Sequence, residues 1–205
     1  MYKNYIFDLF GTIIRDTKQF PYYGNIIKPI YSKVDEFLCV TDFSSKQACL
    51  KGINSRFNLG WDKKQEEEFI IAAKKWSTSM EFIPDIIKVL TALKKDGSKL
   101  ALLTNTHILE IDIYDKLDIG KYFDIVIMSH KIGIAKPDPK IFNIALQKLG
   151  SSSKDTMMIG DNLEKDIIGA EKVGVNALLF DIKQRHPDYK NSIISWKEFI
   201  DRGYG

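Results

Sequence analysis

Short, continuous apolar runs alternate with amphipathic helical patterns along most of the chain. Runs of this kind are typical of strands buried on both faces, because a strand with one wet face would alternate apolar and polar residues. Buried strands separated by helices favour a mostly parallel sheet with helices on both sides, and we therefore predict an α/β fold. The predicted strands are 4–8, 99–103, 124–128, 156–160 and 175–180, and the predicted helices are 84–95, 107–118, 139–149 and 163–173.

Residues 15–80 interrupt this alternation. They hold no apolar run of the same quality, but they contain three amphipathic stretches, near 24–39, 44–58 and 62–79. Asp62 is the predicted N-cap of the third stretch, and Pro84 opens the helix that returns to the sheet. We therefore predict a helical cap domain, residues 15–80, inserted into an α/β core domain of residues 1–14 and 81–205.

Composition limits the classes of partner. The 30 basic and 27 acidic residues give a net charge of +3, spread along the chain without a basic block, which argues against nucleic acid as a partner. Cys39 and Cys49 form neither a CxxC pair nor a disulfide framework, so we expect reduced thiols. The start of the chain lacks a basic-then-apolar leader, and no apolar run approaches about 18 residues, so we expect a cytoplasmic protein without a membrane partner.

Polar residues follow the predicted strands at the points where these end. Ligands of open α/β sheets bind at the carboxyl ends of the strands, so these residues are the candidates for chemistry. Each one alone is better explained as the cap of the next helix. Together they place three carboxylates, an amide, a hydroxyl and an amine at one edge of the sheet. The set comprises Asp8, Thr104, Asn105, Lys136, Asp161 and Asp166.

Three carboxylates at one edge repel each other and have raised pKa values unless a cation neutralises them. Hard oxygen ligands of this kind suit Mg²⁺. In such a site Thr104 can donate a hydrogen bond to a phosphoryl oxygen, and Lys136 can balance its charge. Pro137 forces Lys136 into an extended conformation just before a predicted helix, which Asp138 caps. The alternative for Lys136 is a solvated surface lysine.

Four segments resemble the four motifs of the haloacid dehalogenase (HAD) superfamily of hydrolases. They are "DLFGT" (8–12), "LLTNT" (102–106), "KIGIAKPDPKIF" (131–142) and "MIGDNLEKDIIGA" (158–170). Their order and spacing, and the helical insertion after the first motif, resemble the branch of the superfamily with a helical cap. The resemblance extends over essentially the whole chain and implies a Rossmann-like core and a hydrolase.

The resemblance also implies a covalent mechanism and a metal. Asp8 would attack phosphorus and form an aspartyl-phosphate, which water then hydrolyses. Mg²⁺ would be held by the Asp8 carboxylate, the backbone carbonyl of Phe10 and Asp161, with Asp166 in support. Gly11 would permit the tight turn after the nucleophile.

The same resemblance implies the substrate contacts. Thr104 would contact the transferring phosphoryl group, and Lys136 would steady both that group and Asp8. Asn105 follows Thr104 at the same strand end, and Arg15, at the junction of core and cap, is the predicted anion contact outside the motifs. The expected substrate is a small phosphorylated metabolite, bound by a monomer or a homodimer.

Phe10 departs from the motif of the family phosphatases, which usually carry a second aspartate at this position. That aspartate protonates the leaving group, and such assistance is typically worth about 10²–10⁴-fold. One hypothesis is a Mg²⁺-dependent phosphohydrolase. Its substrate would have a leaving group that needs little protonation, as in an acyl phosphate, or another group would protonate the leaving oxygen. Phosphonate hydrolysis is a weaker possibility, because no lysine of the insertion has the context for a Schiff base.

Two other hypotheses stay open. One is a 2-haloacid dehalogenase-like hydrolase, because those enzymes resemble this chain in having an aromatic residue two positions after the nucleophile. They use no metal, however, and have small polar residues in motif four, where this chain keeps Asp161 and Asp166. The other is a non-catalytic binding protein with the same fold.

Few residues outside the motifs attract a functional interpretation. Tyr22, Tyr23 and Trp76 are expected to pack the cap against the core, although Lys18 and the two tyrosines are near enough to the first motif to face the cleft. His107 directly follows the second motif and is near enough to line the site, but we expect it instead to cap the following helix or to be exposed. The tail "SWKEFIDRGYG" predicts a short amphipathic helix with a structural role.

Overall fold

A computed structural model describes residues 2–204 and confirms the α/β fold. Six strands form one sheet in the order β5-β4-β1-β6-β7-β8, and every neighbouring pair is parallel. Their carboxyl ends therefore meet at one edge. The strands of this sheet are β1 (Asn4–Phe7), β4 (Lys99–Thr104), β5 (Ile125–Met128), β6 (Thr156–Gly160), β7 (Asn176–Phe180) and β8 (Ser192–Ile193).

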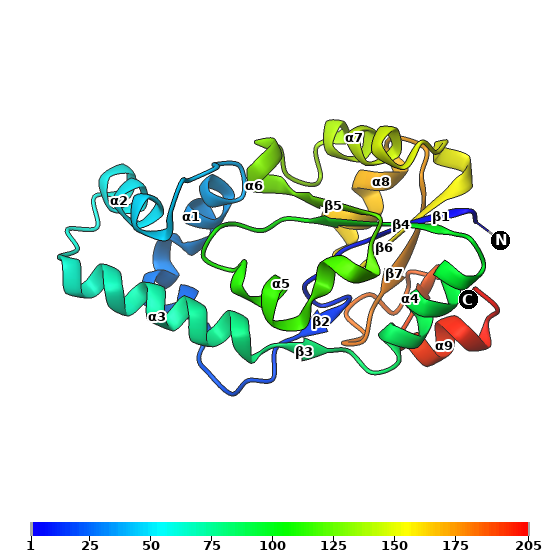
Figure 1. Ribbon diagram of the computed structural model, residues 1–205, viewed down its shortest axis with the longest axis horizontal. Helices are drawn as coiled ribbons and strands as arrows, with labels where there is room; N and C mark the ends of the chain where they lie inside the picture. Colours follow the sequence, from blue (N-terminus) through cyan, green and yellow to red (C-terminus); the bar gives the residue numbers. More distant parts are fainter. Residues whose placement is uncertain (1, 205) are drawn as a thin grey trace.

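Helices cover both faces of the sheet (Figure 1). Tyr5 and Phe7 of β1 pack into one apolar cluster and Ile6 into another, because successive side chains of a strand point to opposite faces. The first cluster includes residues of α4, α5 and α9, and the second includes residues of α7 and α8. The bounds are α4 (Ile86–Lys95), α5 (Asp112–Leu117), α6 (Ser129–Ile132), α7 (Pro139–Leu149), α8 (Gly169–Glu171) and α9 (Trp196–Asp201).

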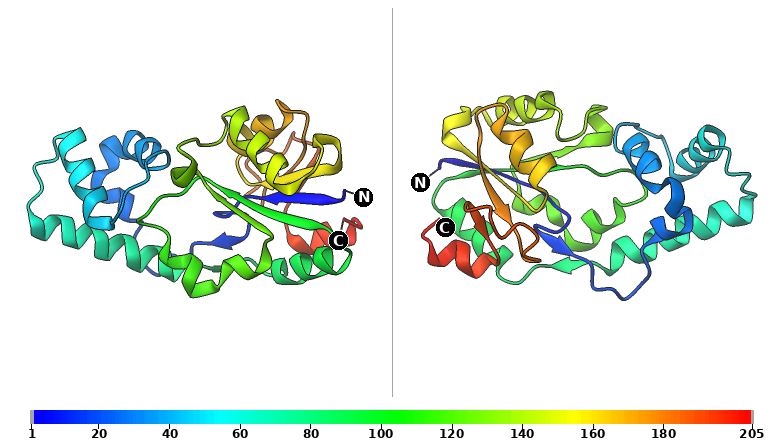
Figure 2. Two further views of the ribbon diagram at one scale, coloured as in Figure 1. Left: turned by 45° about the horizontal axis from the view of Figure 1, so that its top comes forward. Right: turned by 180° about the vertical axis from the view of Figure 1, so that it is seen from behind.

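A helical segment lies beside the carboxyl edge of the sheet (Figure 2). It is flanked by β2 (Ile14–Arg15) and β3 (Glu81–Phe82), which pair antiparallel. Its elements are the 3₁₀ helix η1 (Tyr23–Ile30), α1 (Tyr31–Leu38), α2 (Lys46–Phe57) and α3 (Lys63–Ser79). These bounds lie close to the three predicted amphipathic stretches. The division of the chain into a cap domain and a core domain stays a prediction.

Local sequence signals explain several helix ends. Asp62 caps α3 in a capping box with Gln65, and Asp138 caps α7, whose first residue is Pro139. The structure differs from the prediction after β4: a helix was predicted over 107–118, but α5 begins only at Asp112. The predicted helix 163–173 is a π-helical turn, η4 (Leu163–Ile168), followed by α8. The short 3₁₀ helices are η2 (Ile119–Tyr122) and η3 (Ser153–Asp155).

The three strands β2, β3 and β8 were not predicted, because each has only two residues and a two-residue strand shows no periodicity.

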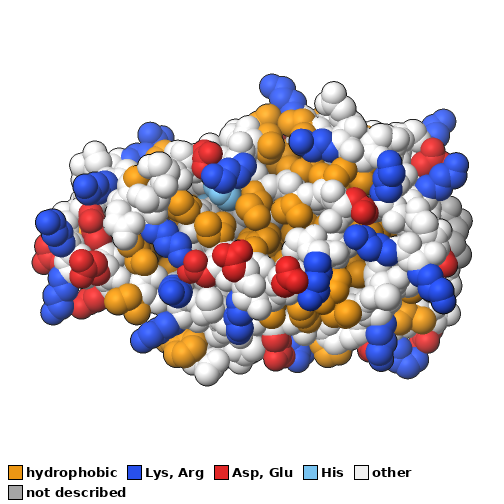
Figure 3. All heavy atoms as spheres, in the orientation of Figure 1, with side chains coloured by type: hydrophobic (Ala, Val, Ile, Leu, Met, Phe, Trp, Pro, Cys, Tyr) orange, Lys and Arg blue, Asp and Glu red, His pale blue; other side chains and the backbone are white. Residues whose placement is uncertain are grey.

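On the face drawn in Figure 3, Lys and Arg side chains are scattered among Asp and Glu side chains. Across residues 2–204, the helices are all too short or too polar to cross a bilayer.

Candidate active site

Three carboxylates converge at the carboxyl edge of the sheet. Asp8 follows β1, Asp161 follows β6 and Asp166 lies in η4, and each offers an oxygen within 4.8 Å of the others. Burial raises the pKa of Asp8 to about 7; Lys136 opposes this shift, and the Asp166 and Asp161 carboxylates add to it. Burial and the charge of Asp166 also raise the pKa of Asp161. A cluster of oxygen donors with this excess of negative charge fits a divalent cation such as Mg²⁺.

Lys136 joins two of these carboxylates. Its Nζ lies 2.6 Å from Asp8 Oδ1 and 2.7 Å from Asp166 Oδ1, and it donates a hydrogen bond to the Leu103 carbonyl at 2.8 Å. Burial lowers the pKa of Lys136, but the Asp166 and Asp8 carboxylates outweigh burial and raise it overall. With 3% of its surface exposed, Lys136 is not the solvated surface lysine of the alternative interpretation.

Thr104 and Asn105 are neighbours at the end of β4, but their side chains differ in hydrogen bonding. The Asn105 amide accepts from the backbone N–H of Lys136 at 2.8 Å and donates to its carbonyl at 2.9 Å. Asn105 therefore fixes the backbone that carries the lysine, whereas its predicted contact with substrate stays a prediction. The Thr104 hydroxyl is buried and has no hydrogen-bond partner among residues 2–204. A buried donor of this kind is suited to a phosphoryl oxygen.

Two glycines allow the carboxylates to approach the strand ends. A Cβ on Gly11 would lie 2.5 Å from Asp161 Oδ2, and Gly11 has a φ of +84°, which other residues rarely adopt. A Cβ on Gly160 would lie 2.3 Å from Asp166 Oδ2. Side chains at either position would push an acid out of the cluster.

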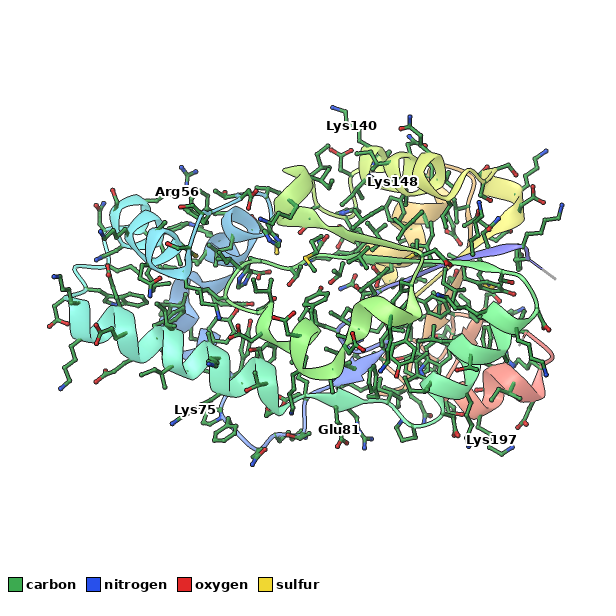
Figure 4. All side chains as sticks on the ribbon, in the orientation of Figure 1. Arg56, Lys75, Glu81, Lys140, Lys148 and Lys197 are labelled. Carbon is green, nitrogen blue, oxygen red and sulfur yellow. The ribbon has the colours of Figure 1, made fainter. Side chains whose placement is uncertain are left out.

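Phe10 lies beside the carboxylates with its ring stacked on Trp76, the centroids 6.2 Å apart. Both rings line a cavity of about 460 Å³ that Asp161 also lines. Arg15 lines the same cavity, but its Nη2 lies 2.7 Å from Glu81 Oε1. Glu81 lies on the outside of the molecule at β3 (Figure 4). The predicted anion contact of Arg15 would therefore compete with this ion pair.

Arg185 is a site residue that the sequence interpretation missed. Its Nη2 donates to the Asp161 carbonyl at 2.9 Å and to Asp161 Oδ2 at 3.0 Å. Arg185 lies on a turn that the Asp181 carboxylate holds. The backbone N–H groups of Arg185 and His186 donate to this carboxylate at 2.9 and 2.7 Å. Asp181 directly follows β7, so the rule of polar residues at strand ends would have pointed to this turn.

The prediction that His107 is exposed or caps a helix is wrong. Its side chain is buried, and its Nε2 lies 3.1 Å from the Tyr23 hydroxyl and 3.7 Å from oxygens of Asp35 and Glu110. The Tyr23 hydroxyl donates to Glu110 at 3.0 Å. His107 lies between the end of β4 and the start of α5, and its contacts with Tyr23 of η1 and Asp35 of α1 join this stretch to the helical segment.

Comparisons with known proteins agree with the family that the four motifs resemble. The family of haloacid dehalogenase-like hydrolases matches residues 2–174. Over 110 residues the chain is 34% identical to ribulose-1,5-bisphosphate 5-phosphatase of Halopiger xanaduensis, covering 52% of this chain and 46% of that protein. Over 125 residues it is 30% identical to glyceraldehyde 3-phosphate phosphatase of Pyrococcus furiosus, covering 60% and 50%. The matches thus span about half the length of these relatives.

Solved structures show the same fold over greater lengths. A HAD phosphatase from Thermococcus onnurineus has a TM-score of 0.64 at 24% identity, with 98% of both chains covered. A 2-haloacid dehalogenase from Pseudomonas syringae has a TM-score of 0.69 at 19% identity, covering 98% of this chain and 99% of that one. A HAD family enzyme from Bacteroides thetaiotaomicron, in complex with magnesium and inorganic phosphate, has a TM-score of 0.66 at 18% identity, covering 87% and 94%. With the family match across most of its length, the chain belongs to the haloacid dehalogenase-like hydrolases.

Proposed function

We propose that the protein is a Mg²⁺-dependent phosphohydrolase that acts on a small phosphorylated metabolite through an aspartyl-phosphate at Asp8. The observation that carries the proposal is the convergence of Asp8, Asp161 and Asp166 around the buried ammonium of Lys136. Two relatives named as phosphatases and a magnesium–phosphate complex of the same fold support it.

Each residue has a role in this proposal. The Asp8 oxygen that is not paired with Lys136 attacks phosphorus, and the bond to the leaving oxygen breaks. Water then attacks the same phosphorus, which releases phosphate and restores Asp8. Lys136 holds Asp8 in place and balances charge, and the Thr104 hydroxyl donates to a phosphoryl oxygen. Asp8, Asp161 and the Phe10 carbonyl would hold Mg²⁺, with Asp166 in support. The bound metal would offset the charge of the phosphoryl group.

Phe10 narrows the substrate within this proposal. It offers no proton to the leaving oxygen, so leaving groups that depart readily as anions are favoured. An acyl phosphate is the clearest case, since a carboxylate leaves without protonation at neutral pH.

A dehalogenase is the second candidate, and the aromatic side chain of Phe10 is the observation in its favour. Halide departs unprotonated, so this chemistry needs no acid. The carboxylate cluster counts against it, because a metal-free mechanism leaves Asp161 beside Asp8 as a like-charged pair.

The first test is phosphate release from acetyl phosphate with and without Mg²⁺, comparing the wild type with Asp8→Asn. We expect release that requires Mg²⁺ and falls by at least about 10³-fold in Asp8→Asn, because the nucleophile is lost. Asp188→Asn, at an exposed position, is the matched control and should keep full activity. Absence of release from the folded wild type in Mg²⁺ would contradict the proposal, and halide release from 2-chloropropionate would then test the second candidate.

A further inference from the structure

The cavity beside Phe10 has an apolar wall and a basic rim. Phe10, Trp76 and Ile182 are among the side chains of the wall. Around it, four basic side chains face two acidic ones, and one of the acids is Asp161 of the carboxylate cluster. The basic residues are Arg15, Lys18, Lys183 and Arg185. A cavity of about 460 Å³ is large enough for a small organic molecule.

The basic side chains come from two segments that are far apart in sequence. Lys18 lies between β2 and η1, where its backbone N–H donates to Asp16 Oδ1 at 2.7 Å and its φ is +59°. Lys183 and Arg185 lie on the turn of residues 181–186, which the buried Asp181 carboxylate fixes through two backbone N–H groups. Both backbones are thus fixed by side-chain carboxylates next to the same cavity.

The four cations differ in the partners they already have. Arg15 is paired with Glu81, and Arg185 donates to Asp161. The ammonium groups of Lys18 and Lys183 form no ion pair within the described part of the chain, residues 2–204. These two lysines therefore carry the positive charge that the protein itself does not neutralise here.

We propose that this cavity holds the leaving group of the substrate, and that Lys18 and Lys183 bind a second anionic group on it, a carboxylate or a second phosphate. The inference rests on the proposed function, since it assumes that the transferring phosphate lies at Asp8. Phe10 lines this cavity, and it stands where the phosphatases that the first motif resembles carry the aspartate that protonates the leaving group. Asp161 of the carboxylate cluster lines the same cavity, which joins the basic rim to the proposed site of phosphoryl transfer. The substrate class is therefore a phosphate compound with an apolar body and a second negative charge.

This arrangement also offsets the missing acid. Binding energy from a remote part of a substrate lowers the barrier when it holds the reacting group in position, so contacts at the rim assist a site that lacks a proton donor.

The test compares two non-hydrolysable probes, phenylphosphonate and 4-carboxyphenylphosphonate, by titration calorimetry of the full chain in Mg²⁺. The probes differ only in the carboxylate. The variant Lys18→Gln/Lys183→Gln removes the two rim charges. The control Lys28→Gln/Lys190→Gln removes the same charge at exposed positions that do not line this cavity.

We expect the wild type and the control to bind the carboxylated probe about five- to tenfold more tightly than phenylphosphonate, as two partly exposed ion pairs allow. The rim variant should bind both probes equally, and added salt should reduce the preference of the wild type. Equal affinities in the wild type, or a preference that the control loses as fully as the rim variant, would overturn the inference.

Turnover separates this inference from the proposed function. Phosphate release from phenyl phosphate and 4-carboxyphenyl phosphate is measured on the same proteins. A preference for the carboxylated phosphonate without release from either ester or from acetyl phosphate would support the cavity and contradict the phosphohydrolase. Release from phenyl phosphate without any preference between the phosphonates would support the phosphohydrolase and contradict the proposed role of the cavity.

Discussion

In the proposed function, Phe10 changes the acid–base chemistry of the site but leaves the carboxylate cluster in place. The carboxylate cluster and Lys136 do not depend on the side chain at position 10, because the expected metal ligand there is a backbone carbonyl. The Phe10 ring packs on Trp76 instead of offering a proton. Under the proposed function, we therefore expect the residue at position 10 to affect which leaving groups are accepted more than whether a cation binds.

Replacing Phe10 with Asp should broaden the range of leaving groups. We expect Phe10→Asp to raise phosphate release from glycerol phosphate, relative to acetyl phosphate, by about 10²-fold, because a carboxylic acid can protonate the alkoxide that leaves. The nearby Asp8 and Asp161 carboxylates favour its protonated form. The measurement is the ratio of kcat/KM for the two substrates.

Phe10→Asn is the matched control, since it has the same size as Asp and no acidic proton. Both variants lose the stacking on Trp76 and should lose similar stability. An equal ratio in the Asp and Asn variants would show that the proton donor lies elsewhere.

At the scale of elements, the buried network around His107 links the helical segment to the strand ends. Tyr23 of η1 and Asp35 of α1 contact His107 from one side, and Glu110 contacts it from the segment after β4. On that side the Tyr31 hydroxyl and the Cys39 thiol both donate to Asp35, and the Tyr22 hydroxyl donates to the Tyr31 hydroxyl. His107 lies three residues after Thr104, so the network joins the helical segment to the end of β4.

This network should make stability depend on pH. Burial lowers the pKa of His107, but the carboxylates of Glu110 and Asp35 outweigh it and raise the pKa overall above 6.5. A raised pKa means that the folded state binds the proton more tightly than the unfolded state. The stabilisation is therefore complete below about pH 6.5 and is lost as the pH rises through the higher folded value.

We expect His107→Gln to lower the free energy of unfolding more at pH 6 than at pH 9, as measured by urea denaturation. Comparing the variant with the wild type at each pH cancels the titration of groups elsewhere. His186→Gln, on the turn after β7, serves as a control that leaves the network intact. A stability difference that is the same at both pH values would contradict the role assigned to the charge of His107.

For the whole molecule, the parallel sheet brings carboxylates from separate segments to one edge, and an apolar core supports that edge. One cluster contains Phe7 of the sheet together with Leu50 and Phe69 of the helical segment. Because the carboxylates are close together only in the folded chain, a cation that binds them stabilises the whole fold.

Mg²⁺ should therefore raise the unfolding temperature of the wild type. At about 100 times its dissociation constant, a ligand that binds only the folded state stabilises it by about 2.7 kcal/mol. We expect a smaller shift in Asp161→Asn, which removes one charged ligand, and the full shift in the exposed control Asp188→Asn. The measurement is thermal unfolding across a Mg²⁺ titration. An identical shift in Asp161→Asn would exclude Asp161 as a ligand.

The sequence alone determined those features that depend on neighbouring residues. Apolar runs predicted the five longer strands. Asp8, Thr104 and Asp161 became candidate site residues because they directly follow these predicted strands. The caps at Asp62 and Asp138 were predictable because a cap bonds to residues two or three positions away. The parallel arrangement of the sheet then followed from the helices between the strands.

Only the tertiary structure decided which distant side chains meet. The sequence carries no local signal that Asn105 fixes the backbone of Lys136, that Arg185 bonds to Asp161, or that His107 is buried against Tyr23. These contacts join residues 24 to 84 positions apart. The physical reason is that such contacts depend on how the helical segment and the loops pack on the sheet, and the energy of that packing is spread over the whole core.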